Sequence, residues 1–233
     1  YEIMPSLVGS EMCIRDSSHI SEIGSIVSAA CLAHDLGNPP FGHSGEKAIS
    51  TYFSEGKGIA LKEELSSIEW DDLIHFEGNA NAFRLLTHQF EGRRKGGFVL
   101  TYSTLASIVK YPFSSSLAGK KSKFGFFTTE EDSFRRIAEE LGMKKLNDFP
   151  LEYARHPLVY LVEAADDICY QMMDIEDAHK LKILTTRETQ DLLLSYFPEE
   201  RKLHMLKTLE IVSDVNEQIG YLLSLIHISE PTR

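Results

Sequence analysis

Apolar residues recur every three or four positions along most of this chain, a spacing that places them on one face of an α-helix. The first series, Ile20, Ile23, Val27 and Ala30, leads into His34 and predicts a helix that ends there. Similar series predict helices near residues 76–90, 105–111, 134–141, 157–180, 187–196 and 199–223. No stretch alternates apolar and polar residues as a half-buried strand does. The pattern therefore predicts an all-α fold in one domain.

Glycine, proline and polar residues interrupt these series. Gly37 and the Pro39–Pro40 pair must break the chain after His34, and a short helix is predicted to restart near Ser44, a suitable N-cap. Three further segments are predicted to be irregular, namely 54–73, 91–97 and 112–128. The last of them is rich in Ser, Gly, Lys and Phe, which is typical of a flexible or substrate-facing loop.

The composition narrows the class of protein. With 233 residues, 42% of them hydrophobic and 25% charged, the chain can bury a sizeable core. The net charge of -11 argues against a broad basic surface for nucleic acid. No apolar run approaches the length of a membrane span. Cys13, Cys31 and Cys169 form no CxxC pair, which suits a reducing, cytoplasmic location.

Both ends of the chain look foreign. Residues 9–17 and 224–233 resemble translated sequencing-adapter sequence, so residues 1–17 and 224–233 are expected to be non-native. On this hypothesis the natural protein occupies residues 18–223 and lacks both of its true ends. The alternative is a natural disordered tail at each end.

The first candidate for chemistry is the His34-Asp35 pair at the predicted helix end. An imidazole nitrogen and an adjacent carboxylate oxygen can bind one divalent cation, such as Mn, Fe, Co, Ni, Zn or Mg. His43 follows the rigid turn, and Glu46 lies three residues later on the same helix face. A histidine held by a carboxylate can exchange protons with a metal-bound water. The alternative is that His34 and Asp35 are a solvated surface pair, that His43 is only a histidine at a helix start, and that Glu46 is a first-turn carboxylate favoured by the helix dipole.

The second candidate lies on the long helix predicted for residues 157–180. Asp166, Tyr170 and Asp174 are spaced by four residues and share one helix face, which offers two carboxylates and a phenol in line. The alternative is a solvated acidic face. The apolar character of the rest of this helix favours burial, and buried acids need polar partners.

Four blocks of this sequence resemble the HD-domain deoxyguanosinetriphosphate triphosphohydrolases. The first block is Ala-Cys-Leu-Ala-His-Asp-Leu-Gly-Asn-Pro-Pro-Phe-Gly-His-Ser-Gly-Glu at residues 30–46. The second is His-Phe-Glu-Gly-Asn-Ala-Asn-Ala-Phe-Arg at 75–84, the third is Ser-Ile-Val-Lys-Tyr-Pro at 107–112, and the fourth covers residues 163–177. The blocks occur in the family's order. The resemblance implies an HD-type helical bundle, here a partial domain within residues 18–223.

The resemblance also implies roles for individual residues. The metal ligands would be His34, Asp35 and Asp166. The catalytic residues would be His43, Glu46 and Glu77, with His75 as a further candidate near them. Substrate would be bound by Lys110 and Tyr111 at the triphosphate and by Tyr170 and Asp174 at the deoxyribose. The expected reaction is metal-dependent hydrolysis of a dNTP to deoxynucleoside and triphosphate, and the family implies a homo-oligomer.

The sequence departs from the family pattern in one respect. The family's metal site uses another histidine well upstream of the His-Asp pair, and His19 lies too close to His34 to supply it. We therefore expect this metal ligand, and the C-terminal part that closes the substrate pocket, to be absent, which makes the activity of this chain uncertain. Two other functions are possible: another HD-domain nucleotide phosphohydrolase, or a non-catalytic dNTP-binding regulator. The basic runs 93–95 and 120–123 hint only weakly at nucleic acid.

Overall fold

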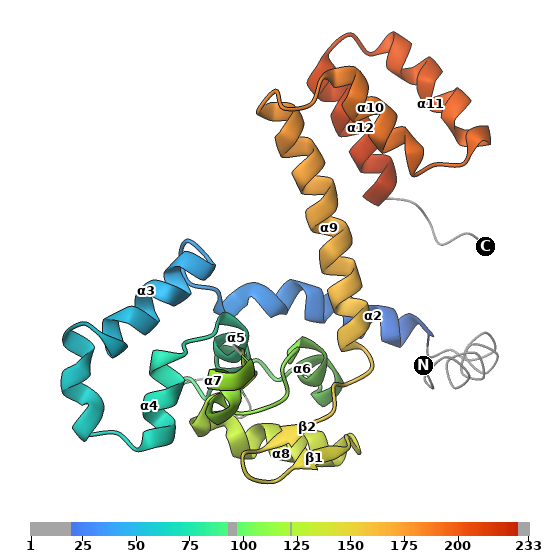
Figure 1. Ribbon diagram of the computed structural model, residues 1–233. Helices are drawn as coiled ribbons and strands as arrows, with labels where there is room; N and C mark the ends of the chain where they lie inside the picture. Colours follow the sequence, from blue (N-terminus) through green and yellow to red (C-terminus); the bar gives the residue numbers. More distant parts are fainter. Residues whose placement is uncertain (1–19, 93–96, 122, 228–233) are drawn as a thin grey trace. The chain divides into compact units, whose positions relative to one another are not determined.

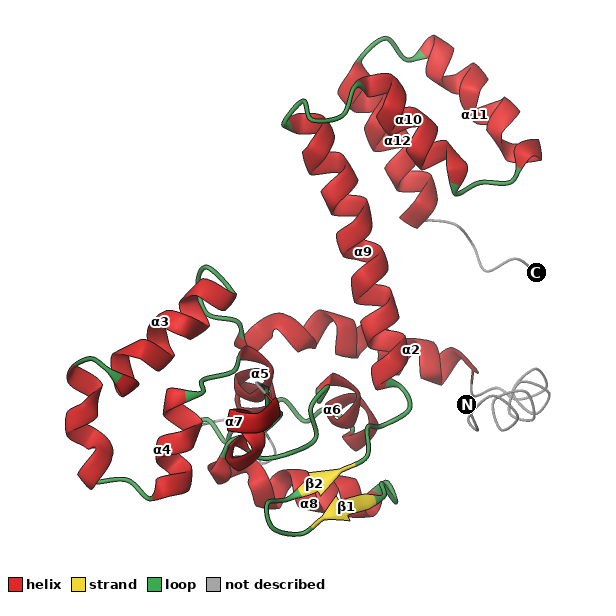
Figure 2. Ribbon diagram, viewed as in Figure 1, coloured by secondary structure: helices red, strands yellow, loops and turns green. Residues whose placement is uncertain are grey.

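The computed structural model describes residues 20–92, 97–121 and 123–227. Their regular secondary structure is almost entirely helical, with one short two-stranded sheet (Figure 2), and this confirms the all-α class. The chain divides into two compact units, an N-terminal unit (Tyr1–Ala164) and a C-terminal unit (Ala165–Arg233). His19 and the basic run 93–95 lie outside the described residues. No helix in the described ranges is both long and apolar enough to cross a membrane.

The elements of the N-terminal unit follow one another as Figure 1 labels them. Its helices are α2 (Ile20–Ala33), α3 (His43–Ser54), α4 (Ser67–Ile74), α5 (Gly78–Thr87), α6 (Tyr102–Ile108), α7 (Ala118–Lys121), α8 (Glu131–Glu140) and the first residues of α9 (Val159–Lys180). Short 3-10 helices lie between them, η1 (His34–Gly37), η2 (Lys57–Glu63), η3 (Ser115–Leu117) and η4 (Thr128–Glu130). Strands β1 (Lys145–Asn147) and β2 (Glu152–Tyr153) pair antiparallel, with Lys145 opposite Tyr153.

Several helices begin and end where the sequence predicts. In α8, Phe134, Ile137 and Ala138 are buried on one face, in agreement with their helical spacing. The helix ends before Gly142, whose φ of 64° lies in the left-handed region that glycine adopts without a Cβ clash. The amide of Gly142 donates to the carbonyl of Glu139 at 3.1 Å, so the end of the helix is satisfied locally.

Other predictions of secondary structure were wrong. Helix α3 begins at His43 with Gly42 as its N-cap, so Ser44 lies inside the first turn. The segment 54–73 contains η2 and the start of α4, because Ser66 and Glu69 form a reciprocal capping box that starts a helix. The small β1–β2 sheet was not expected, since strands of two and three residues are too short to show alternation.

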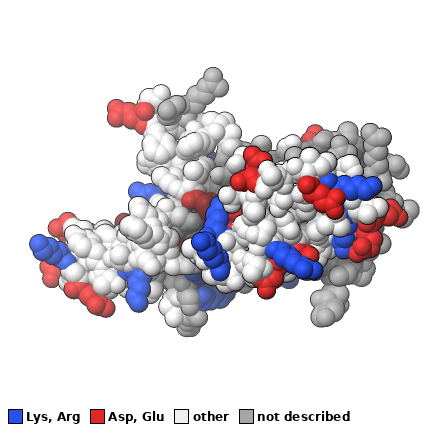
Figure 3. Space-filling view, turned by 90° about the horizontal axis from the view of Figure 1, so that it is seen from above, with Lys and Arg blue, Asp and Glu red and all other residues white. Residues whose placement is uncertain are grey.

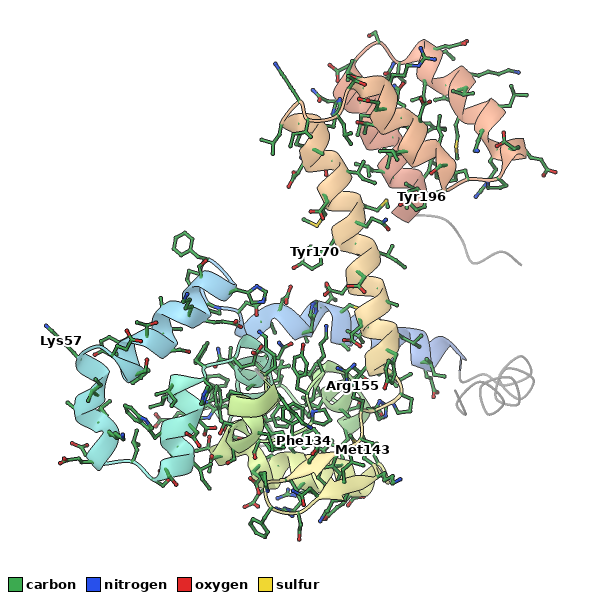
Figure 4. The ribbon with its side chains drawn as sticks, in the orientation of Figure 1. Lys57, Phe134, Met143, Arg155, Tyr170 and Tyr196 are labelled. Carbon is green, nitrogen blue, oxygen red and sulfur yellow. The ribbon has the colours of Figure 1, made fainter. Side chains whose placement is uncertain are left out.

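The largest correction concerns residues 112–128, which were predicted to form a loop. Phe124 and Phe126 are fully buried there, and Phe126 stacks on Phe134 with ring centroids 4.6 Å apart. Phe134 belongs to α8 and is labelled in Figure 4. Phe83 and Tyr153 contact the same Phe134 ring edge-on, at 5.7 and 5.9 Å. These contacts between aromatic rings stabilise the core beyond the area that they bury. The segment is part of the core because its phenylalanines supply that core.

The C-terminal unit contains the rest of α9, followed by α10 (Thr186–Ser195), α11 (Glu199–Ile211) and α12 (Val215–His227). Its core includes Met172, Leu193 and Leu222. A single helix was predicted for residues 199–223, and this was wrong. Asp214 accepts a hydrogen bond from the amide of Glu217 at 2.9 Å, which caps the start of α12 and separates it from α11. Helix α12 continues through residues 224–227, the first part of the segment expected to be non-native.

A buried carboxyl group in α4 gives a testable dependence of stability on pH. Asp72 is 6% exposed, and burial raises the pKa of its carboxyl above the ordinary value, although the hydrogen bond from the Thr128 amide opposes the shift. A raised folded-state pKa means that protonation stabilises the fold. This contribution is fully present below the unfolded pKa and is lost as the pH rises through the folded-state pKa.

We therefore expect Asp72→Asn to stabilise the N-terminal unit by about 1 kcal/mol at neutral pH and to flatten its pH dependence in the acid range. The asparagine oxygen can still accept from the Thr128 amide, which the carboxylate does at 2.8 Å, and no buried charge remains. Urea unfolding from pH 4 to 8 measures both effects. Glu64→Gln, at an exposed position, is the control, and equal pH slopes for Asp72→Asn and wild type would contradict the assignment.

Candidate active site

The His34-Asp35 pair lies in η1, directly after α2. The Nδ1 atom of His34 is 2.7 Å from the carbonyl oxygen of Cys31, and because a carbonyl only accepts, Nδ1 carries the proton. The Nε2 atom lies 3.3 Å from Oδ1 of Asp35, which also accepts a hydrogen bond from the Asn38 amide at 2.8 Å. The backbone thus orients the imidazole so that its second nitrogen faces the carboxylate.

These two donor atoms fit one side of a divalent-metal site. A histidine whose Nδ1 donates to a backbone carbonyl presents Nε2 as its ligand atom, and here a carboxylate oxygen lies beside Nε2. In the described ranges, no three His, Cys, Asp or Glu side chains gather closely enough to hold a metal ion. The third predicted ligand, Asp166, belongs to α9 in the C-terminal unit. Metal binding therefore stays a prediction.

The turn after Asp35 is held against the start of α5. Asn81 donates from its amide to the carbonyl of Gly37 at 2.9 Å, across 44 residues of sequence. The amide of Gly78 donates to Oε1 of Glu46 at 2.8 Å. A Cβ on Gly78 would lie 2.4 Å from Oδ1 of Asn38 and 2.9 Å from Oε1 of Glu46, so a larger residue here would displace both side chains. The first turns of α5 therefore position both the turn and α3.

The predicted catalytic carboxylates share one cation. Glu46 lies on α3, and Glu77 is the N-cap residue of α5. The Nζ atom of Lys123 lies 2.9 Å from Oε2 of Glu77 and 3.5 Å from Oε2 of Glu46. The side chain of Glu77 is only 3% exposed, and its other oxygen accepts from Asn79 at 2.6 Å. The structure thus brings Glu46 and Glu77 together and adds a lysine between them.

The two candidate histidines occupy different positions. His43 is exposed at the start of α3, and within the described residues no hydrogen bond joins it to Glu46. His75 is the C-cap residue of α4, and its Nδ1 lies 3.1 Å from the carbonyl oxygen of Asp71. The pairing of His43 with Glu46 stays a prediction, because the carboxylate here bonds to Lys123 and the Gly78 amide.

A second charged network surrounds the predicted triphosphate residues. Lys110 contacts Oε1 of Glu163 at 2.8 Å, and Arg155 contacts the other oxygen of Glu163 at 3.0 Å. The guanidinium of Arg155, which lies between β2 and α9 (Figure 4), is 5.8 Å from the ring centroids of both Tyr111 and Tyr160. Burial by itself lowers the pKa of the Lys110 amine, but the hydrogen bond and charge of Glu163 outweigh it and raise the pKa. Lys110 and Arg155 are therefore two cations held by one carboxylate.

The remaining predicted substrate residues lie on α9 in the C-terminal unit. Because α9 is continuous, Asp166, Tyr170 and Asp174 keep the helical spacing that the sequence predicts. Asp166 is half-buried, and Tyr170 and Asp174 are exposed, with Tyr170 projecting from the side of the helix (Figure 4). Their roles stay predictions.

Sequence reasoning missed Lys123 and Arg155. Lys123 had been noted only within a short basic run, yet it is the cation between buried Glu77 and half-buried Glu46, and Lys121 of the same run pairs with Glu152. A single lysine before the apolar Phe124–Phe127 stretch was the available signal, because a lysine drawn toward a core needs a charged partner. On the face of the molecule drawn in Figure 3, Lys and Arg are scattered among acidic and uncharged residues, with no broad basic patch.

The described residues define an all-helical protein that carries a histidine–aspartate pair, a histidine at the start of the next helix, and two lysine-bridged carboxylates. No family model matches the chain. Individual proteins, however, are similar to the chain in sequence. The chain is 49% identical over 182 residues to the deoxyguanosinetriphosphate triphosphohydrolase-like protein of Pseudomonas aeruginosa strain LESB58, covering 75% of this chain and 40% of the relative.

Two further relatives have similar names and match a similar share of this chain. The chain is 43% identical over 188 residues to a deoxyguanosinetriphosphate triphosphohydrolase-like protein of Synechocystis, covering 75% of this chain and 42% of that protein. It is 34% identical over 209 residues to the deoxyguanosinetriphosphate triphosphohydrolase of Yersinia enterocolitica, covering 75% and 38%. Over three quarters of its length the chain is therefore similar to proteins named deoxyguanosinetriphosphate triphosphohydrolase or deoxyguanosinetriphosphate triphosphohydrolase-like. It spans about two fifths of the length of these relatives.

Proposed function

We propose that the protein hydrolyses dNTPs of the dGTP type to deoxynucleoside and intact triphosphate, through an HD-type site. The similarity to the P. aeruginosa relative carries this proposal, because it extends over 75% of the chain at 49% identity. The arrangement of the N-terminal unit supports it. The His34-Asp35 pair, α3 and the N-cap carboxylate of α5 are all tied to the first turns of one helix.

The proposed roles follow from the chemistry of each group. A divalent cation held by His34, Asp35 and Asp166 would offset the negative charge that develops on the α-phosphate oxygens. His43 exchanges a proton with the attacking water or with the 5′-oxygen that leaves. Glu46, on the same helix as His43, and Glu77, at the start of α5, supply negative charge close to α3.

Substrate binding is assigned to two further groups of residues. Lys110 binds the phosphates as a point charge, beside Tyr111, and both lie next to the ion pairs of Glu163. Tyr170 and Asp174 hold the deoxyribose from α9. The tyrosine ring crowds the 2′ position and so disfavours a ribonucleotide.

The identity of the products tests this proposal. The chain is incubated with each dNTP and Mn²⁺, and the products are separated by anion-exchange chromatography. We expect deoxynucleoside and triphosphate in equal amounts, whereas release of single phosphates would contradict the reaction class.

The same assay on a chimera separates this chain's residues from the requirement for a longer protein. In the chimera, this chain replaces the matching segment of the P. aeruginosa relative. If the chain alone shows no turnover and the chimera hydrolyses dNTP to deoxynucleoside and triphosphate, the proposal is supported. A chimera that binds dNTP without turnover favours a nucleotide-binding regulator, and one that hydrolyses a different nucleotide favours another HD-domain phosphohydrolase.

A further inference from the structure

Lys123 connects three parts of the N-terminal unit that are far apart in sequence. It follows α7, and it contacts Glu46 of α3 and Glu77 at the start of α5, which lie 77 and 46 positions before it. Its side chain is 28% exposed, so the amine lies at the edge of the interior. One cation is thus shared by the two carboxylates to which the proposed function assigns catalytic roles.

Each carboxylate is fixed at both of its oxygens. Oε1 of Glu46 accepts from the Gly78 amide at 2.8 Å, and Oε1 of Glu77 accepts from the Asn79 side chain at 2.6 Å. Both neutral donors belong to the first turn of α5. The second oxygen of each group faces Lys123. The lysine therefore completes two partly satisfied carboxylates and sets the direction in which each one points.

The charge balance shows why this cation matters. Glu77 is almost fully buried, and a buried carboxylate without a counter-charge takes up a proton or moves toward water. Burial by itself lowers the pKa of the Lys123 amine, but the hydrogen bond with Glu77 and the charges of both acids outweigh it and raise the pKa. The amine therefore stays charged at neutral pH. Without it, two like charges would face one another with only neutral donors to hold them.

We propose that Lys123 is a positioning residue, which holds the carboxylates of Glu46 and Glu77 in place and does not itself bind the nucleotide. This inference rests on the proposed function and adds to it a residue that acts on the rate of turnover. Loss of the lysine would misdirect Glu46, the carboxylate predicted to assist His43, and would leave the substrate contacts at Lys110 and Tyr111 intact.

The test compares kcat and KM for dGTP with Mn²⁺ among point variants of the full chain. We expect Lys123→Met to lower kcat by about 10²-fold with KM nearly unchanged, because misplacement of a catalytic group costs about this much. Lys123→Arg keeps the charge and should recover most of kcat. Lys121→Met removes a similar lysine that pairs with Glu152 at an exposed site, and it should leave both constants unchanged. Should Lys123→Met fail to fold in urea titrations, Lys123→Gln replaces it, since glutamine retains a hydrogen-bond donor without charge.

The outcomes separate the possibilities. A raised KM with unchanged kcat would show that Lys123 binds substrate directly, and unchanged constants would show that it is only a structural tie; either result overturns the proposal. If the wild-type chain shows no turnover, the same variants are compared in the chimera, which tests the proposed function, and ¹³C-carboxyl NMR of the chain tests Lys123 without any activity. The Glu77 carboxyl resonance should move in Lys123→Met and return toward its wild-type position in Lys123→Arg, because the Lys123 amine lies 2.9 Å from Oε2 of Glu77. An unchanged resonance in Lys123→Met would overturn the positioning role without any measurement of activity.

Discussion

Replacing Gly37 with alanine is expected to lower the free energy of unfolding of the N-terminal unit by about 3 kcal/mol. A Cβ at this position would lie 2.0 Å from the backbone nitrogen of Ala82 and 2.1 Å from the carbonyl oxygen of Gly78. Both of these atoms belong to the backbone of α5 and cannot rotate away. The turn would have to separate from the helix and would lose the hydrogen bond from Asn81. Urea unfolding measures the loss.

The same substitution should also reduce turnover, because the turn carries His34 and Asp35 on one side and leads to His43 on the other. Gly24→Ala is the matched control. No atom lies within 4 Å of a Cβ at Gly24, and this residue is inside α2, so alanine there should stabilise the chain by about 0.5–1 kcal/mol. Equal stabilities for Gly37→Ala and wild type would mean that the turn does not pack on α5 as described.

Substitution of His43 by alanine is expected to lower kcat for dGTP by about 10²- to 10⁴-fold, the range typical of a lost acid–base group. His43 is exposed at the first residue of α3, so its removal creates no cavity and should change the free energy of unfolding by less than about 0.5 kcal/mol. Steady-state kinetics and urea unfolding on the same preparation give both values. The combination of a large kinetic effect and a small thermodynamic effect identifies a chemical role.

His88→Ala provides the control for this experiment. His88 is also exposed, caps the end of α5 and contacts only the Phe90 ring edge-on among its aromatic neighbours in the described residues. It belongs to no predicted site, and its replacement should leave kcat unchanged. If His43→Ala turns over dGTP as fast as His88→Ala does, the catalytic role assigned to His43 is wrong.

The spacing of apolar residues was sufficient to predict secondary structure wherever that structure depends on neighbours in sequence. Helix α8 follows from the spacing of Phe134, Ile137 and Ala138, because residues three and four apart meet on one helix face. The long α9 follows in the same way and keeps Asp166, Tyr170 and Asp174 in line. Local rules failed for residues 112–128, where polar and glycine residues suggested a loop. That segment packs into the core through its phenylalanines, and Phe126 stacks on Phe134 of α8, a contact that no local pattern contains.

The sequence by itself determined the all-α class, most helix positions and the residue types available for chemistry, because periodicity and capping act over a few positions. It also carried the family resemblance, which the relatives confirm. Only the tertiary structure decided which charges meet. Glu46 reaches the Gly78 amide across 32 residues, and Lys123 reaches Glu46 across 77. Such contacts depend on how helices pack, and packing depends on small features distant in sequence, such as the missing Cβ atoms of Gly37 and Gly78 against their neighbours.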